Sequence, residues 1–89
     1  MHADKNKTLR LLKTVRGQID GLIKMIEENR YCIEISTQLM ASQSILKKIN
    51  LDILKGHLNH CIKESFNKTE AERDKKIAEL ITVLDKLMK

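Results

Sequence analysis

Two cysteines and one histidine are the residues of this chain best suited to chemistry. His57 and Cys61 are separated by three residues, so on a helix they project from the same face on successive turns. A thiolate and an imidazole in that arrangement form a two-ligand clip for a soft or borderline metal ion. The same spacing also occurs in pairs that only pack in a core, so the pair alone leaves both interpretations open.

Cys32 supplies a possible third ligand from elsewhere in the chain. On a continuous helix, Cys32 and His57 would be separated by roughly 37 Å along the axis, so they cannot meet within one chain. If two copies of the helix pack antiparallel, Cys32 of one copy lies beside His57 and Cys61 of the other. The spacing therefore predicts two identical sites per dimer, each built across the interface.

Two kinds of chemistry fit this set of residues. Two thiolates and one imidazole form a soft set of three ligands, which suits Cu(I) better than a structural zinc ion with its four ligands. Alternatively, Cys32 and Cys61 could act as a thiol switch without a metal, in which one thiolate attacks an oxidised or persulfide-modified partner. His57 distinguishes the two interpretations, because a dithiol switch does not need an imidazole.

Other candidate residues carry weaker signals. His60 points about 100° away from Cys61 around a helix, so we expect it to be exposed. His2 is expected to lie in a frayed N-terminal segment. The sequence shows no Ser/His/Asp set, glycine-rich phosphate loop or pair of carboxylates suited to a buried site, so we do not expect an enzyme.

Three helices are expected to position these residues. The chain has no proline, and its three glycines fall inside apolar-periodic stretches, which indicates an all-α fold. Apolar residues at spacings of three and four predict a first helix over about residues 5–28 and a second over about 31–66, with a break at 27–30. A capping box, Thr69-Glu70-Ala71-Glu72, is expected to open a third helix.

The length of the chain favours self-association. Its 89 residues fit a single domain, residues 1–89, and a domain of this size buries only about 60–65% of its unfolded surface. The second helix would span roughly 50 Å, more than a small monomer can cover. Gly17 and Gly21 share one face of the first helix, where another backbone can come close. A homo-oligomer is therefore expected.

Charge and hydropathy indicate where the protein works. Most of the net charge of +5 lies in residues 1–24, which suggests a polyanionic partner such as nucleic acid, although a solvated lysine-rich face would look similar. No apolar run approaches the roughly 20 residues of a membrane span, and no signal peptide is recognisable. We expect a cytoplasmic protein without a membrane partner, with its cysteines in a reducing compartment.

Three runs of sequence together resemble the copper-sensitive operon repressor (CsoR) family. They are Lys13-Thr14-Val15-Arg16-Gly17-Gln18-Ile19-Asp20-Gly21, then Met25-Ile26-Glu27-Glu28 through Tyr31-Cys32, and Gly56-His57-Leu58-Asn59-His60-Cys61. The resemblance covers nearly the whole chain. The combined Cys-x24-His-x3-Cys spacing is far more specific than any of its parts.

The resemblance implies a fold, a ligand and a mechanism. It implies three-helix protomers that pair as antiparallel four-helix-bundle dimers and assemble into a disc-like tetramer, a dimer of dimers. The apo-protein would bind operator DNA, and the inducer would release it. Cu(I) would be held by Cys32 of one subunit with His57 and Cys61 of another, and Tyr31 and Glu79 would link this site to DNA affinity.

The family also contains sensors of other inducers. Nickel sensing would need a histidine in place of Cys61, and formaldehyde sensors lack that second thiol, so the resemblance disfavours both. The persulfide-sensing branch keeps the two cysteines and stays open as the alternative inducer. A helical scaffold or copper-storage protein without DNA binding is a third, more distant interpretation.

Basic residues on the first two helices are the expected DNA surface. Lys48 falls where relatives carry a DNA-contacting arginine, whereas Leu11 departs from another such basic position and Arg10 stands beside it. We expect phosphate contacts from five residues: Arg10, Lys13, Arg16, Lys47 and Lys48. The leading interpretation is a transcriptional repressor that Cu(I) releases from its operator.

Overall fold

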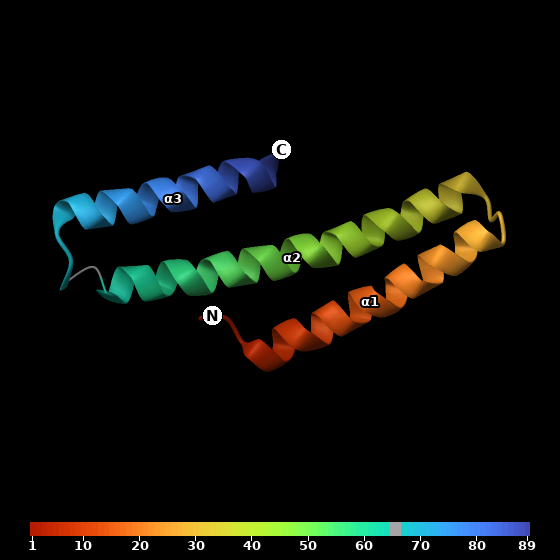
Figure 1. The fold of residues 1–89 in the computed structure, drawn as a ribbon, viewed down its shortest axis with the longest axis horizontal. Helices are drawn as coiled ribbons and strands as arrows, with labels where there is room; N and C mark the ends of the chain where they lie inside the picture. The colour runs from red at the N-terminus through yellow and green to blue at the C-terminus, as the bar shows by residue number, and fades with distance from the viewer. Residues whose placement is uncertain (65–66) are drawn as a thin grey trace. The chain divides into compact units, whose positions relative to one another are not determined.

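Three helices make up the described chain (Figure 1). The computed structural model describes residues 1–64 and 67–89. Helix α1 spans Lys5–Glu27, α2 spans Cys32–Glu64 and α3 spans Glu70–Met88. No strand occurs within the described ranges, so the predicted all-α class is confirmed. The expected end of the second helix at residue 66 lies outside the described residues. In the part of the chain that is described, no helix is long and apolar enough to cross a membrane.

Side-chain caps set the starts of α1 and α3. The Asp4 carboxylate accepts a hydrogen bond from the amide of Lys7 at 3.1 Å. The Thr69 hydroxyl accepts one from the amide of Glu72 at 3.3 Å, as the predicted capping box requires. Each cap satisfies a backbone donor that the first helical turn would otherwise leave without a partner.

A left-handed residue ends α1 and reverses the chain. Asn29 has φ 53°, its amide donates to the carbonyl of Ile26 at 3.1 Å, and the Arg30 amide donates to the carbonyl of Met25 at 3.0 Å. These two bonds form a Schellman motif, in which asparagine is one of the few side chains that tolerate the left-handed conformation. The predicted break at residues 27–30 is therefore confirmed.

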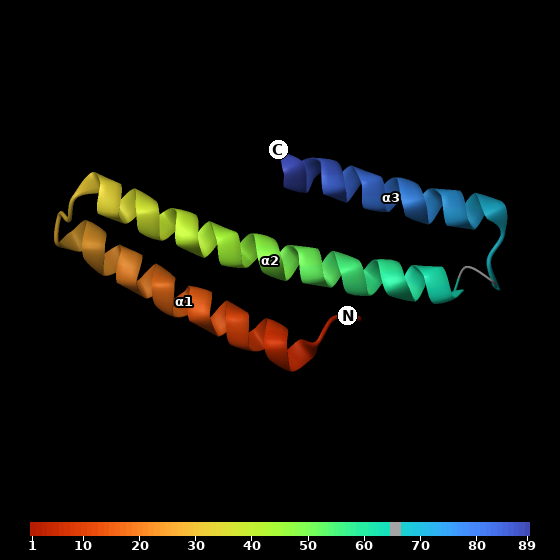
Figure 2. The same cartoon turned by 180° about the vertical axis from the view of Figure 1, so that it is seen from behind.

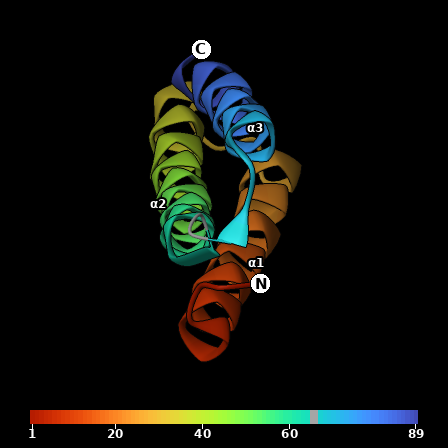
Figure 3. The same ribbon diagram turned by 90° about the vertical axis from the view of Figure 1, so that its left-hand side faces the viewer.

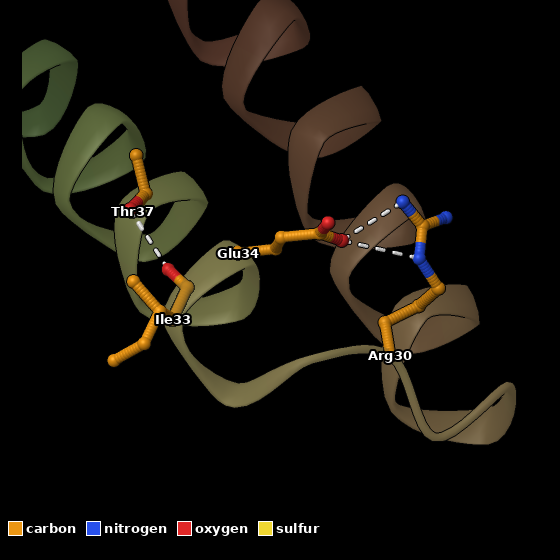
Figure 4. Close-up of polar contacts among 4 residues, drawn as sticks. All are labelled: Arg30, Ile33, Glu34 and Thr37. Atoms are coloured by element: carbon orange, nitrogen blue, oxygen red, sulfur yellow. Dashed lines mark hydrogen bonds and ion pairs between the residues drawn. The ribbon is translucent and has the colours of Figure 1, made fainter.

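An ion pair spans the connection to α2 (Figure 4). The Arg30 guanidinium donates from Nη2 and Nε to one carboxylate oxygen of Glu34, at 2.9 and 3.3 Å. One turn further on, the Thr37 hydroxyl donates to the carbonyl of Ile33 at 2.8 Å. The ion pair is exposed and adds little stability. It links the connecting segment to the first turn of α2, which begins at Cys32.

Residues 4–51 form the first of two compact units. In this unit, α1 packs antiparallel against the first part of α2 (Figures 1 and 2). Its buried apolar residues are Val15, Leu22 and Ile49. Between the helices, the buried Ser42 hydroxyl donates to Oε1 of Gln18 at 2.7 Å. This polar pair fixes the register of the two helices.

The second unit combines residues 52–89 with residues 1–3. Here α3 lies beside the last part of α2 (Figures 1 and 2; Figure 3 gives the end-on view), and Leu80 is its buried apolar residue. A cavity of about 250 Å³ lies in this unit, lined by Leu58, Cys61, Ile62, Lys68, Arg73, Lys76, Ile77 and Leu80.

Neither unit completes an apolar core. Within the described residues, no large side chain is fully buried, and many apolar side chains are exposed, including Leu12, Ile19, Ile23, Leu39, Leu46, Ile62, Ile77 and Ile81. A Cβ built on Gly17 or Gly21 would meet nothing within 4 Å. The close approach expected at these glycines is therefore not made within one chain.

The Ser42–Gln18 bond gives a direct test of the α1–α2 packing. Ser42→Ala is expected to lower the free energy of unfolding by about 1 kcal/mol, because Gln18 loses a short hydrogen bond in a largely buried place. Ser44→Ala is the matched control, because the exposed Ser44 hydroxyl donates only within its own helix, to the carbonyl of Met40. Urea unfolding at one fixed protein concentration measures both. Equal effects of the two substitutions would contradict the role of Ser42.

Candidate metal centre

His57 and Cys61 form a preassembled pair near the end of α2. Both residues are half-buried, and Nε2 of His57 lies 3.5 Å from Sγ of Cys61. Nitrogen and sulfur ligands bind zinc-like ions at about 2.0 and 2.3 Å, so donor atoms at this separation can share one ion. The pair therefore fits two positions of a metal site.

Cys32 lies far from this pair along the same helix. It is the first residue of α2, it is exposed, and both cysteines are free thiols. Among the described residues, no group of three His, Cys, Asp or Glu side chains is placed to hold a metal ion. Within the described residues, the His57–Cys61 pair therefore offers two ligands.

The cavity beside Cys61 combines an apolar wall with basic residues. Lys68 forms an ion pair with Glu64 at 3.7 Å, and Lys76 forms one with Glu79 at 3.6 Å. Glu79, one of the two residues expected to link the site to DNA affinity, is thus held by a lysine that lines this cavity. Tyr31, the other, is 68% exposed. The linking role of both residues stays a prediction.

His60 does not lie exposed as expected. It is half-buried, and its Nε2 lies 2.7 Å from the Glu64 carboxylate. The ring of His2 stacks on it, with the ring centroids 3.6 Å apart and the planes 12° apart. His2 also lies 6.4 Å from the ring of His57. The expectation of a frayed N-terminal segment is therefore wrong, because this stack holds the segment against α2.

Gly56 explains how the segment can lie so close to α2. A Cβ at this position would come within 2.9 Å of the backbone of His2 and Ala3, so a larger residue would push the segment away. Loss of solvent, followed by the positive charge of His60, lowers the pKa of His2 below its usual value. Sequence reasoning missed this contact. The available signal was a glycine inside a helix directly before His57.

The five basic residues expected to contact DNA are all exposed and all lie in the first unit. On α1, steps of three residues carry Arg10, Lys13 and Arg16 across the side that faces away from Val15. On α2, Lys47 lies about 200° around the helix from the buried Ile49, so it also faces outward. All five cations are therefore accessible to a polyanion.

Comparisons with known proteins agree on one family. Residues 4–86 match the family described as metal-sensitive transcriptional repressors. The chain is 34% identical over 85 residues to the copper-sensing transcriptional repressor RicR of Mycobacterium tuberculosis, covering 96% of this chain and 88% of RicR.

Two solved structures share the fold. The copper-sensing repressor CsoR with Cu(I) from Geobacillus thermodenitrificans NG80-2 superposes with a TM-score of 0.81 at 32% identity, covering 100% of this chain and 94% of that one. The nickel-responsive transcriptional regulator InrS gives a TM-score of 0.79 at 30% identity, covering 98% and 96%. The chain therefore belongs to the CsoR family of metal-sensitive transcriptional repressors.

Proposed function

We propose that this protein represses transcription as an oligomer on operator DNA and leaves the DNA when Cu(I) binds a site shared by two subunits. The observation that carries the proposal is the His57–Cys61 pair, with its donor atoms 3.5 Å apart, on the same helix as the free thiol of Cys32. The copper-sensing activity of RicR and of the Geobacillus CsoR supports the choice of metal.

The geometry of α2 favours a site between two chains. On a regular helix, the 25 residues from Cys32 to His57 make about seven complete turns. The two positions then differ by only about 20° around the helix axis, so both side chains share one face. Leu39 and Leu46 lie on that face, 46% and 44% exposed. An antiparallel second copy would bury these leucines and bring its own Cys32 to the His57–Cys61 pair.

The donor set favours Cu(I) over metals that need more ligands. Two thiolates and one imidazole match the soft ligands and low coordination that Cu(I) accepts. Cu(I) would supply strong bonds to both thiolates. The chain's own contribution is to tie the start of one α2 to the end of another, so that the loaded and empty forms favour different arrangements of the dimer.

Exposed cations on the first unit would bind the operator phosphates. Arg10, Lys13 and Arg16 lie on the outward side of α1, and Lys47 and Lys48 are exposed on α2. Contacts of this type release counterions and make affinity fall with salt. In the proposed assembly, the cations of neighbouring subunits would add to this surface.

Assembly is the first test of the proposal. Size-exclusion chromatography with light scattering on the reduced protein should report about four times 10.3 kDa, a dimer of dimers. Leu46→Glu should shift the mass downward, because it places a charge in the proposed α2–α2 contact. A protein that stays monomeric at every concentration would contradict the shared site, because Cys32 and His57 lie near opposite ends of the same helix and cannot meet within one chain.

Charge reversal tests the DNA surface. Lys48→Glu should weaken binding to the protein's own promoter region and lower the slope of log K against log salt by about one. Lys86→Glu makes the same change in charge at an exposed residue of α3 and should leave both quantities near wild type. If the two variants have the same DNA affinity and the same salt dependence, Lys48 is not part of the DNA-binding surface. A wild type that binds no promoter DNA would favour the scaffold or copper-storage interpretation.

His57 separates metal sensing from thiol switching. His57→Ala leaves two thiolates that can still hold Cu(I), but in a changed geometry. Under anaerobic reducing conditions, Cu(I) should lower wild-type operator affinity by about 5- to 150-fold, the usual range of allosteric coupling, and barely affect the variant. Apo-protein binding should be unchanged in both. His60→Ala is the control on the neighbouring turn, and Ni(II) is the control metal, because InrS is nickel-responsive.

A persulfide-responsive repressor is the second candidate function. The cavity that reaches Cys61 is lined by Lys68, Arg73 and Lys76, which favour a small anionic sulfur donor. One cysteine thiolate would attack the outer sulfur of an organic persulfide and release the organic thiolate. The other subunit's cysteine would then attack the new persulfide, closing a disulfide and releasing hydrosulfide.

The donor experiment decides between the two candidates. Operator complexes of wild type and His57→Ala are treated in parallel with Cu(I) and with an organic persulfide. Release of the wild type by the donor alone, with an intersubunit Cys32–Cys61 crosslink in mass spectra and no dependence on His57, would overturn the copper proposal.

A further inference from the structure

Residues 1–3 make a specific contact with α2. His2 stacks face to face on His60, and the backbone of His2 and Ala3 lies where a side chain at position 56 would be. His60 is in turn held by Glu64 at 2.7 Å. Ring stacking and backbone packing thus fix this short segment from two sides.

The arrangement does not make His2 a metal ligand. The rings of His2 and His60 lie in nearly parallel planes, 12° apart, so their nitrogens do not converge on a common point. No group of three potential ligands occurs in the described part of the chain, this segment included. The imidazole of His2 therefore contacts its neighbours through its ring face, by stacking on His60.

The segment lies along one edge of the His57–Cys61 pair. Around a regular helix, His60 is about 60° from His57, and the His2 ring lies 6.4 Å from the His57 ring. Cys61, in turn, lines the cavity formed with α3. His2 thus lies beside the His57 ligand of the pair, and the cavity lies beside the Cys61 ligand.

We propose that residues 1–3 form a strap that covers the His57 edge of the metal-binding pair and slows the passage of metal ions and chelators without ligating the metal. The strap controls the rate of exchange and leaves the equilibrium affinity almost unchanged. The copper measurement rests on the proposed function, whereas the strap itself can be measured on the metal-free protein.

The kinetic test measures transfer of Cu(I) from the loaded, full-length protein to a chromogenic Cu(I) chelator. His2→Ala and Gly56→Ala should each speed transfer by about 3- to 10-fold, the effect expected for losing one aromatic stack. His2→Phe should keep the wild-type rate, because a phenyl ring can stack on His60 but cannot bind a metal. The Cu(I) affinity of all three variants should stay within about twofold of wild type, well below the cost of losing a charge-assisted or metal bond.

One control removes the effect of helix propensity. Gly56→Ala strengthens the helix as well as displacing the strap, by about 1 kcal/mol of propensity. Asn59→Ala raises propensity in the same turn at an exposed residue and should leave the transfer rate unchanged. A rate increase in Asn59→Ala equal to that in Gly56→Ala would overturn the strap.

The metal-free test uses carbethoxylation of histidines by diethylpyrocarbonate, read residue by residue in mass spectra. In the apo-protein, His2→Ala and Gly56→Ala should raise the reaction rate of His60 by about 3- to 10-fold, whereas His2→Phe and Asn59→Ala should not. Unchanged His60 reactivity in both strap variants would overturn the proposal, whatever the metal. If the wild type does not bind Cu(I), the proposed function is wrong. The carbethoxylation rate of His60 still tests whether the strap forms.

A different result in the affinity measurement identifies a different role. If His2→Ala and His2→Phe both lower Cu(I) affinity tenfold or more, about 1.4 kcal/mol, His2 is a ligand and the strap is wrong. If transfer rates of all variants equal that of the wild type, residues 1–3 do not control access. Faster transfer with preserved affinity, restored by His2→Phe, is the result that supports the proposal.

Discussion

The apolar surface of α2 is the constraint on which the rest of the structure depends. The helix is 33 residues long, and in each unit a single helix packs against it, which covers only part of its circumference. Large apolar side chains such as Leu39 and Leu46 consequently stay exposed. Burying them on a second copy would release water from apolar surface, which is the main driving force of association. In the proposed assembly, self-association would therefore complete the apolar core.

This constraint couples chemistry to assembly. The donor atoms of His57 and Cys61 are in place within one chain, whereas Cys32 is the first residue of the same helix. In the proposed dimer, a ligand that needs all three residues binds across the contact between the two α2 helices. In that arrangement the binding energy would act directly on the relation between subunits, and coupling would not require a long pathway through a core.

Local signals in the sequence predicted the helices well. Asp4, Asn29 and Thr69 act through hydrogen bonds to residues within four positions, so the boundaries that they set can be recognised from sequence. The His57–Cys61 spacing predicted a shared face for the same reason. The stack of His2 on His60 escaped prediction, because it joins residues far apart in sequence and has no periodic pattern. Only the backbone position of Gly56 reveals why the contact is possible.

The fold by itself does not select the inducer. A copper-sensing and a nickel-responsive protein superpose on this chain almost equally well, with TM-scores of 0.81 and 0.79. Selectivity for one inducer must therefore arise from the donor atoms and from access to them. The metal that a site prefers depends on the type and number of its ligands more than on the fold that carries them. In this chain, Cys61 lines a cavity with basic residues, and the ring of His2 lies 6.4 Å from the ring of His57. Small changes at these two edges could alter the inducer while the three helices stay the same.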